Sequence, residues 1–289
     1  MPRIPDILLE SVIYLYPSEK AAKNGDWIGG SGFLVGFPSE DAPDKWGYIY
    51  AVTNRHVVEN AQSRTLRINT RDGKVDIIST DFEDWTCSTS DDLAVTMVNV
   101  NREKHKFSHV DATGLIDQTV IDQLLIGPGD EVFMPGRLIS HDGRQTNTPC
   151  VRFGNISMMP QEPVLREDGS NQDSFLVDMR SISGYSGSPA FVFIPPSDWP
   201  SRRLRLHPDE NRRLAKYWLL GVDWGNLPLW TDVVFKADKQ TRHPDELGVN
   251  SHSGLAGVVP AWKLRELLNE RNLILERREL DAKFAAEQA

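Results

Sequence analysis

The stretch GYSGSPAF, from Gly184 to Phe191, is the most informative part of this sequence. Ser186 lies between Gly184 and Gly187, and glycine permits positive φ angles and the close approach of other backbone. A tight turn of this kind can expose the Ser186 hydroxyl and point two backbone N–H groups at one position in space. Turns of glycine and serine are frequent in loops, so the stretch gains its meaning from partners elsewhere in the chain.

Two upstream segments contain side chains that suit an exposed hydroxyl. His56, in TNRHVVEN, follows the strand-like run Tyr48–Val52 and is expected just past the end of that strand. Asp92, in SDDLAVTMV, immediately precedes an apolar run of strand character. A carboxylate placed there can fix the tautomer of an imidazole, which can then take a proton from a hydroxyl.

Each of these three residues also has an ordinary structural interpretation, as a residue beside a strand, a turn residue or part of a loop. Their occurrence together in the order His, Asp, Ser favours a nucleophilic relay of base, orienting carboxylate and nucleophile. Asp91 is the alternative to Asp92 as the orienting carboxylate. We favour Asp92 because it directly precedes Leu93-Ala94-Val95.

Further segments follow in a consistent order along the chain. With those above, the set comprises GGSGFLVG (29–36), TNRHVV (53–58), DDLAV (91–95), GPGDEVFMPG (127–136), GYSGSPAF (184–191), LLGVDWG (219–225) and GLAGVVPAWKLRELL (254–268). This set resembles the motifs of trypsin-like serine peptidases of the chymotrypsin fold, in the HtrA-type bacterial and intracellular branch. The resemblance implies an all-β fold of two six-stranded antiparallel β-barrels with a C-terminal α-helix.

The resemblance also implies an organisation into domains. Residues 1–112 are expected to form the first barrel, which carries the histidine and the aspartate, and residues 113–260 the second, which carries the serine and the substrate cleft. Residues 261–289 are expected to form the closing helix. HtrA proteins have a PDZ domain after this helix, and we expect none here. Catalytic residues split between two β-rich halves predict a cleft at their interface.

The roles of individual residues follow from the same resemblance. It implies that Ser186 is the nucleophile, His56 the general base and acid, and Asp92 the orienting carboxylate. The backbone N–H groups of Gly184 and Ser186 would form the oxyanion hole. Peptide bonds would then be hydrolysed through an acyl-enzyme, without a cofactor or metal.

The resemblance places the substrate cleft as well. Asp223, Trp224 and Gly225 are expected on the strand that pairs with an extended substrate, with Trp224 as a wall of the pocket. Arg180 stands six residues before the nucleophile, where the family has the base of its primary pocket. It would favour an acidic side chain at the cleaved position, unless it pairs with Asp178 or Asp223.

One departure from the family bears on activation. Zymogen-activated relatives carry an aspartate directly before the nucleophile, and this chain has Tyr185. We therefore expect no activation by cleavage of the N-terminus. An active serine endopeptidase is the first hypothesis. The alternative is a binding or scaffold module of the same fold, with little hydrolysis or with hydrolysis that needs an activating protein partner.

Charge and composition limit the other classes of function. The net charge of −9 over 289 residues argues against a general nucleic-acid binder, in spite of the basic stretch Ser201–Lys216. Only two cysteines are present, Cys87 and Cys150, which favours a reducing compartment. No signal peptide is recognisable, and no apolar run approaches the roughly 18 residues that span a bilayer. We expect a cytoplasmic protein with a protein or peptide substrate, and with neither nucleic-acid nor membrane partners.

Two long segments interrupt the second half. Pro195–Lys216 and Asn226–Ser253 are expected to be insertions, either functional loops or tolerated surface variation. The second contains His243, Asp245 and His252, for which a metal site is a remote alternative.

Overall fold

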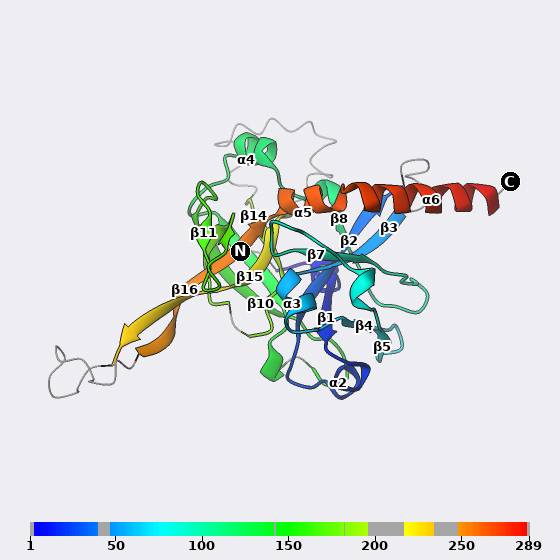
Figure 1. The fold of residues 1–289 in the computed structure, drawn as a ribbon, viewed down its shortest axis with the longest axis horizontal. Coiled ribbons are helices and arrows are strands. Elements are labelled where there is room, and N and C mark those ends of the chain that lie inside the picture. Colours follow the sequence, from blue (N-terminus) through cyan, green and yellow to red (C-terminus); the bar gives the residue numbers. More distant parts are fainter. Residues whose placement is uncertain are drawn as a thin grey trace.

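The computed structural model describes residues 3–39, 47–141, 143–181, 183–195, 217–233 and 248–287. Two β-rich halves lie side by side, and helices cover their edges (Figure 1). His243, Asp245 and the basic stretch 201–216 lie outside the described residues, as does the side chain of His252.

The first half is built around one eight-stranded sheet. Its strands are β1 Val12–Tyr16, β2 Gly30–Pro38, β3 Gly47–Thr53, β4 Thr65–Asn69, β5 Val75–Ile78, β6 Thr86–Cys87, β7 Ala94–Met97 and β8 Val110–Asp111. The order is β5-β4-β1-β2-β3-β7-β6, and β8 pairs with β2 in parallel. A hairpin across Arg71-Asp72-Gly73 joins β4 to β5, and Gly73 adopts the positive φ of 79° that its turn requires.

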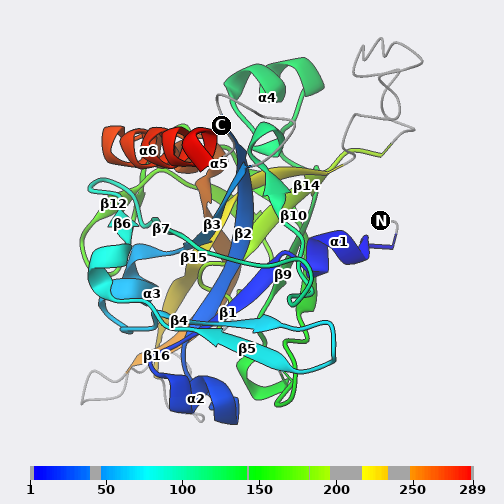
Figure 2. The same cartoon turned by 90° about the vertical axis from the view of Figure 1, so that its right-hand side faces the viewer.

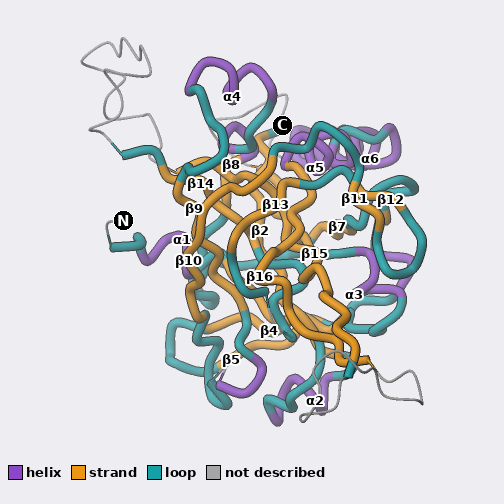
Figure 3. The backbone as a smooth tube through the Cα atoms, turned by 90° about the vertical axis from the view of Figure 1, so that its left-hand side faces the viewer, coloured by secondary structure: helices purple, strands orange, loops and turns teal. Residues whose placement is uncertain are grey.

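The second half is a closed barrel of six antiparallel strands in the order β10-β13-β16-β15-β14-β9. The strands are β9 Glu131–Gly136, β10 Cys150–Met158, β13 Phe175–Asp178, β14 Pro189–Phe193, β15 Tyr217–Asp232 and β16 Gly248–Pro260. A separate small hairpin is formed by β11 Val164–Leu165 and β12 Asn171–Gln172. Figures 2 and 3 place this hairpin on the same side of the molecule as β7 and the short helix that follows β3.

The helices are short except at the C-terminal end. They are α1 Asp6–Leu9, α2 Glu19–Asn24, α3 Arg55–Glu59, α4 Gln118–Leu124, α5 Ala261–Leu268 and α6 Arg271–Glu287, with single 3-10 turns at Phe82–Asp84, Ala112–Gly114 and Ile139–His141. The sequence predicts one closing helix over residues 261–289. Instead it forms α5 and α6, and α6 packs on the first half: Arg277 donates to the Tyr50 hydroxyl at 3.1 Å, and the Tyr48 hydroxyl donates to Asp281.

One hydrophobic core extends through both halves. Buried side chains of β2 and β3, such as Phe33 and Val52, belong to the same cluster as Phe133 and Phe191 of the barrel. Phe133 and Phe191 stack with ring centroids 5.2 Å apart. The all-β class, the closed six-stranded barrel and the C-terminal helices are those of a chymotrypsin-like fold, as expected. The first half differs in detail, because its described strands form an eight-stranded sheet. The domain boundaries at residues 112 and 260 stay a prediction.

The segment Asn226–Ser253 is not simply an inserted loop. β15 continues past the barrel to Asp232, and β16 already begins at Gly248, so the two strands form a long ribbon that projects from the body (Figure 1). Pairing continues along the ribbon with register shifts near Gly225 and Pro228. These shifts, together with the proline, break the alternation by which a strand is recognised in sequence. Residues 196–216 and 234–247 of the two expected insertions are not described.

Candidate active site

His56 lies where the first half passes from strand to helix. β3 ends at Thr53 and α3 begins at Arg55, so the histidine stands in the first turn of a short helix beside the sheet. Asn54, between these elements, donates from its side chain to the backbone carbonyl of Asp92 at 2.9 Å. The junction that carries His56 is therefore tied directly to the loop that carries the aspartate.

Asp92 holds His56 through both of its carboxylate oxygens. Oδ2 lies 2.7 Å from Nδ1 of the ring, and Oδ1 accepts the His56 backbone N–H at 2.9 Å. A carboxylate at Nδ1 favours the tautomer in which Nε2 is free to accept a proton. Burial raises the pKa of Asp92, but the hydrogen bond from His56 and the positive charge of Arg166 outweigh it, so the pKa is lowered.

Asp91, the alternative carboxylate, points to other partners. Its Oδ1 accepts from the Gln172 side chain at 2.9 Å, and its Oδ2 accepts from Ser90 at 2.8 Å. Lys263 of α5 lies 4.0 Å from the same Oδ2. The structure thus brings Asp92, and not Asp91, to the imidazole.

Arg166 is a member of this cluster that sequence reasoning missed. It lies on the β11–β12 hairpin, and its Nη2 is 3.1 Å from Oδ2 of Asp92. Its guanidinium also stacks on the Trp224 ring, 4.8 Å from the centroid. From the same hairpin, Gln172 accepts the Asp92 backbone N–H at 2.8 Å. No motif marks this hairpin in the sequence, and only the packing of the second half on the first reveals its role.

The turn that carries Ser186 is fixed by Ser31 of the first half. The Ser31 hydroxyl donates to the Gly184 carbonyl at 2.6 Å, and its backbone N–H donates to the Ser186 carbonyl at 2.9 Å. Gly184 and Gly187 have positive φ angles of 99° and 87°. A Cβ atom on Gly187 would lie 2.1 Å from the Ser31 carbonyl oxygen. Both the backbone conformation and the close approach therefore require glycine.

Tyr185 anchors the same turn from the other side. The residue is fully buried, and its hydroxyl donates to the Cys150 carbonyl on β10 at 2.8 Å. The Arg152 guanidinium lies over its ring at 5.7 Å. Tyr185 thus packs its turn onto the barrel. Cys150 and Cys87 are both free, half-buried thiols.

His56 and Ser186 line one open pocket of about 650 Å³. Its lining comprises His56, Asn60, Leu165, Arg166, Glu167, Asp168, Ser181, Ser183, Ser186, Trp224, Gly225, Asn226, Leu227, Pro228 and Trp230. Both halves of the chain contribute to it, as expected for a cleft between them. Among the described residues no hydrogen bond joins the Ser186 hydroxyl to the His56 ring.

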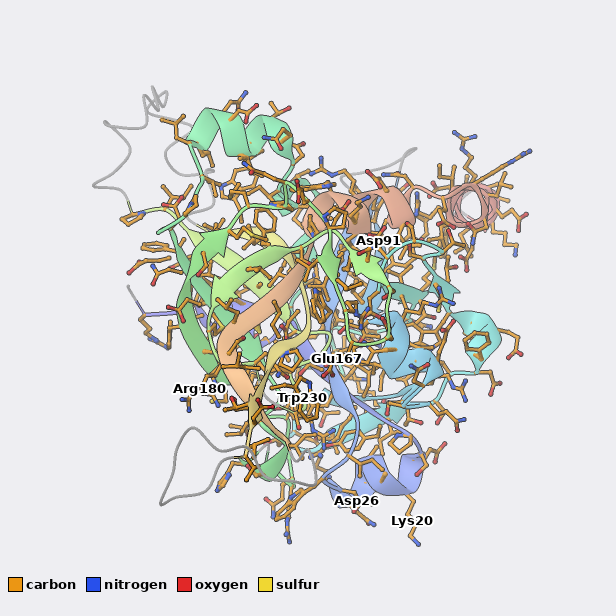
Figure 4. The ribbon with its side chains drawn as sticks, turned by 60° about the vertical axis from the view of Figure 1, so that its left-hand side comes forward. Lys20, Asp26, Asp91, Glu167, Arg180 and Trp230 are labelled. Carbon is orange, nitrogen blue, oxygen red and sulfur yellow. The ribbon has the colours of Figure 1, made fainter. Side chains whose placement is uncertain are left out.

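The residues predicted to bind substrate take different places. Trp224 and Gly225 line the pocket, whereas Asp223 is fully buried behind it and accepts a hydrogen bond from Ser181 at 2.7 Å. Burial raises the pKa of Asp223 to about 7, although the Ser181 hydrogen bond opposes the shift. Arg180 is exposed and is not part of the lining, and Figure 4 shows it away from the labelled pocket residues Glu167 and Trp230. The lining therefore offers no support for acidic specificity through Arg180.

Within the described ranges, no group of three or more histidine, cysteine, aspartate or glutamate side chains is arranged to hold a metal ion. Nor does any helix in those ranges have the length and apolar character needed to cross a bilayer.

Comparisons with known proteins give similarity at the level of solved structures. No family model matches the chain, and no curated protein does. The HtrA-type protease AlgW with decapeptide is 16% identical with a TM-score of 0.43, covering 83% of this chain and 50% of the other. The chain thus spans half the length of that AlgW chain.

Two further solved structures are similar to the same degree. Deg5 is 14% identical with a TM-score of 0.42, covering 76% of this chain and 81% of the other. The inactive form of the Rv3671c protease is 15% identical with a TM-score of 0.44, covering 90% and 88%. This chain is thus similar to an HtrA-type protease, to Deg5 and to the Rv3671c protease, in each case at low sequence identity.

Proposed function

We propose that this protein is a serine endopeptidase that hydrolyses peptide bonds through His56, Asp92 and Ser186. The observation that carries the proposal is the pair of contacts between Asp92 and His56, made beside Ser186 in one open pocket. An oriented imidazole next to an exposed hydroxyl is the arrangement that nucleophilic catalysis requires.

In the proposed mechanism Nε2 of His56 takes the proton of Ser186 while Oγ attacks a substrate carbonyl. Asp92 stabilises the imidazolium, and the backbone N–H groups of Gly184 and Ser186 donate hydrogen bonds to the developing oxyanion. His56 then returns its proton to the leaving amine. Water, activated by the same imidazole, releases the acyl group. A Ser–His hydrogen bond is often formed only when substrate binds, so its absence here is compatible with this mechanism.

A fluorophosphonate probe, which reacts with activated serines, tests the proposal directly. We expect covalent labelling of the wild-type protein and none of Ser186→Ala. Asp92→Asn should retain the fold and lose labelling rate by orders of magnitude, because the imidazole loses its oriented tautomer. Mass spectrometry of the adduct locates the modified residue. Labelling at another serine, or equal labelling of Ser186→Ala, would refute the proposal.

The second candidate is a conditional enzyme or a binding module of the same fold. The same missing hydrogen bond between Ser186 and His56 favours this candidate if a partner protein, rather than the substrate, brings the two side chains together. Labelling that appears only after addition of an unfolded polypeptide such as β-casein would support it. The proposal includes a protein or peptide substrate, a cytoplasmic location and, in the conditional case, an activating protein partner.

A further inference from the structure

Ser31 lies where the first half meets the turn that carries Ser186. It is the second residue of β2, and no part of it is exposed. Its N–H, its carbonyl and its hydroxyl all make hydrogen bonds to other segments of the chain. A buried polar residue that joins several segments constrains how those segments lie relative to one another.

Two of these bonds hold the residues whose N–H groups would form the oxyanion hole. The Ser31 hydroxyl donates to the Gly184 carbonyl at 2.6 Å, and the Ser31 N–H donates to the Ser186 carbonyl at 2.9 Å. The N–H groups of Gly184 and Ser186 have no backbone acceptor among the described residues. Ser31 therefore fixes each of the two residues through its carbonyl, and leaves its N–H available to a negatively charged oxygen.

Arg137 orients the Ser31 hydroxyl. The hydroxyl oxygen accepts the backbone N–H of Arg137 at 2.8 Å, so the hydroxyl proton is directed to the Gly184 carbonyl. Arg137 is itself fully buried. Its guanidinium donates to the carbonyl of Ile28 at 2.6 Å and to that of Asp26, labelled in Figure 4, at 2.7 Å. The group that orients the hydroxyl is thus anchored to the segment that precedes β2.

Gly184 is the residue of the turn that most needs such a constraint. Glycine has a wide conformational range, and Gly184 is held at a φ of 99°. A rotation of its backbone would turn its N–H away from the position of the oxyanion. A displacement of about 1 Å in a catalytic group lowers a reaction rate by up to about a hundredfold.

A fourth bond of Ser31 provides an internal comparison. The Thr53 hydroxyl, at the end of β3, donates to the Ser31 carbonyl at 2.8 Å. This bond supports the backbone of Ser31 from the strand that precedes His56. It is buried and of similar length, but its acceptor lies on Ser31 and not on the turn.

We propose that Ser31 is a positioning residue for the oxyanion hole, since its hydroxyl and its N–H set the directions of the Gly184 and Ser186 N–H groups. This proposal rests on the proposed peptidase function and adds to it a residue of the first half that acts on the second. Ser31 does not touch the substrate in this mechanism, and it acts through the backbone of the turn.

The kinetics of labelling by a fluorophosphonate probe test the proposal. The phosphonyl oxygen of the probe takes the place of the oxyanion, so the labelling rate at saturating probe depends on the two N–H groups. In Ser31→Ala we expect this rate to fall about tenfold or more, while the half-saturating probe concentration changes by less than about twofold. Ser31→Cys keeps the shape of the side chain with a weaker donor, so its rate should lie between those of Ser31→Ala and the wild type.

Thr53→Val is the matched control. It removes one buried hydrogen bond to Ser31 and leaves both bonds from Ser31 to the turn. Its rate at saturating probe should stay within about twofold of the wild type, although both variants lose one buried hydrogen bond. Equal losses in Ser31→Ala and Thr53→Val, or a wild-type rate in Ser31→Ala, would overturn the proposal.

Hydrogen–deuterium exchange separates this proposal from the proposed function, because it requires no activity. The amides of residues 183–188 should exchange faster in Ser31→Ala than in the wild type or in Thr53→Val. If the wild type is not labelled and exchange rises only in Ser31→Ala, the control of the turn by Ser31 stands and the peptidase activity fails. If the wild type is labelled and Ser31→Ala reacts and exchanges as the wild type does, the positioning role fails alone.

Discussion

The buried carboxyl group of Asp223 predicts a specific dependence of stability on pH. Asp223 has no exposed surface, and its Oδ2 accepts from Ser181. Burial raises its pKa from 3.8 to about 7 in the folded protein. The substitution Asp223→Asn keeps the shape and an oxygen that can accept from Ser181, and it removes the titration.

The sign follows from the raised pKa. Between about pH 4 and about pH 7 the folded state retains a proton that the unfolded state has lost, so the contribution of Asp223 to stability falls as pH rises. It is fully present below the unfolded pKa of 3.8 and is lost as the pH rises through about 7. A shift of about three pKa units corresponds to about 4 kcal/mol. The wild type should therefore lose up to about 4 kcal/mol of unfolding free energy from about pH 4 to about pH 8 through this group, whereas Asp223→Asn should not. The stability of Asp223→Asn relative to the wild type should increase by the same amount.

Urea unfolding at several pH values measures this difference. Asp178→Asn, at the exposed end of β13, controls for the removal of one negative charge from the same barrel. A difference between Asp223→Asn and the wild type that stays constant with pH, or that decreases as pH rises, would refute the reasoning. Intact labelling of the variant by the fluorophosphonate probe would show that the pocket is preserved.

Two further predictions concern the contacts around the relay. Arg166→Gln removes one positive charge that, after the larger effect of His56, lowers the pKa of Asp92. A carboxyl group with a lowered pKa stabilises the fold above its unfolded pKa, and this stabilisation is lost as pH falls. Acid unfolding followed by circular dichroism should therefore shift to higher pH, with a loss of about 1–3 kcal/mol at neutral pH. Arg166→Lys should recover part of the loss, and an unchanged transition in Arg166→Gln would contradict the ion pair. Tyr185→Phe removes the hydroxyl that anchors the turn carrying Ser186, so thermal unfolding should show a loss of about 1 kcal/mol and fluorophosphonate labelling should slow. A labelling rate equal to that of the wild type would show that the anchor does not matter for the turn.

Much of the fold and of the site could be predicted from local patterns. The strand-like run before His56 and the apolar run after Asp92 correspond to β3 and β7. The glycines around Ser186 adopt the positive φ angles that their turn requires. Such features depend on alternation, on glycine and on the chemistry of a few side chains, and these are properties of short segments.

Other features were decided by contacts between distant segments. Arg166 reaches Asp92 only because a hairpin of the second half packs on a loop of the first. Arg180, placed in the pocket by analogy, is exposed outside it. The ribbon of β15 and β16 was interpreted as an inserted loop, because Pro228 and its register shifts hide the strand periodicity. These features could not be predicted because the spacing of residues along a chain does not determine where a side chain points or which distant residues it contacts. Those depend on strand register and on how the two halves pack. The residue types of the proposed relay could therefore be inferred from the sequence, whereas their supporting contacts and the shape of the pocket required the folded structure.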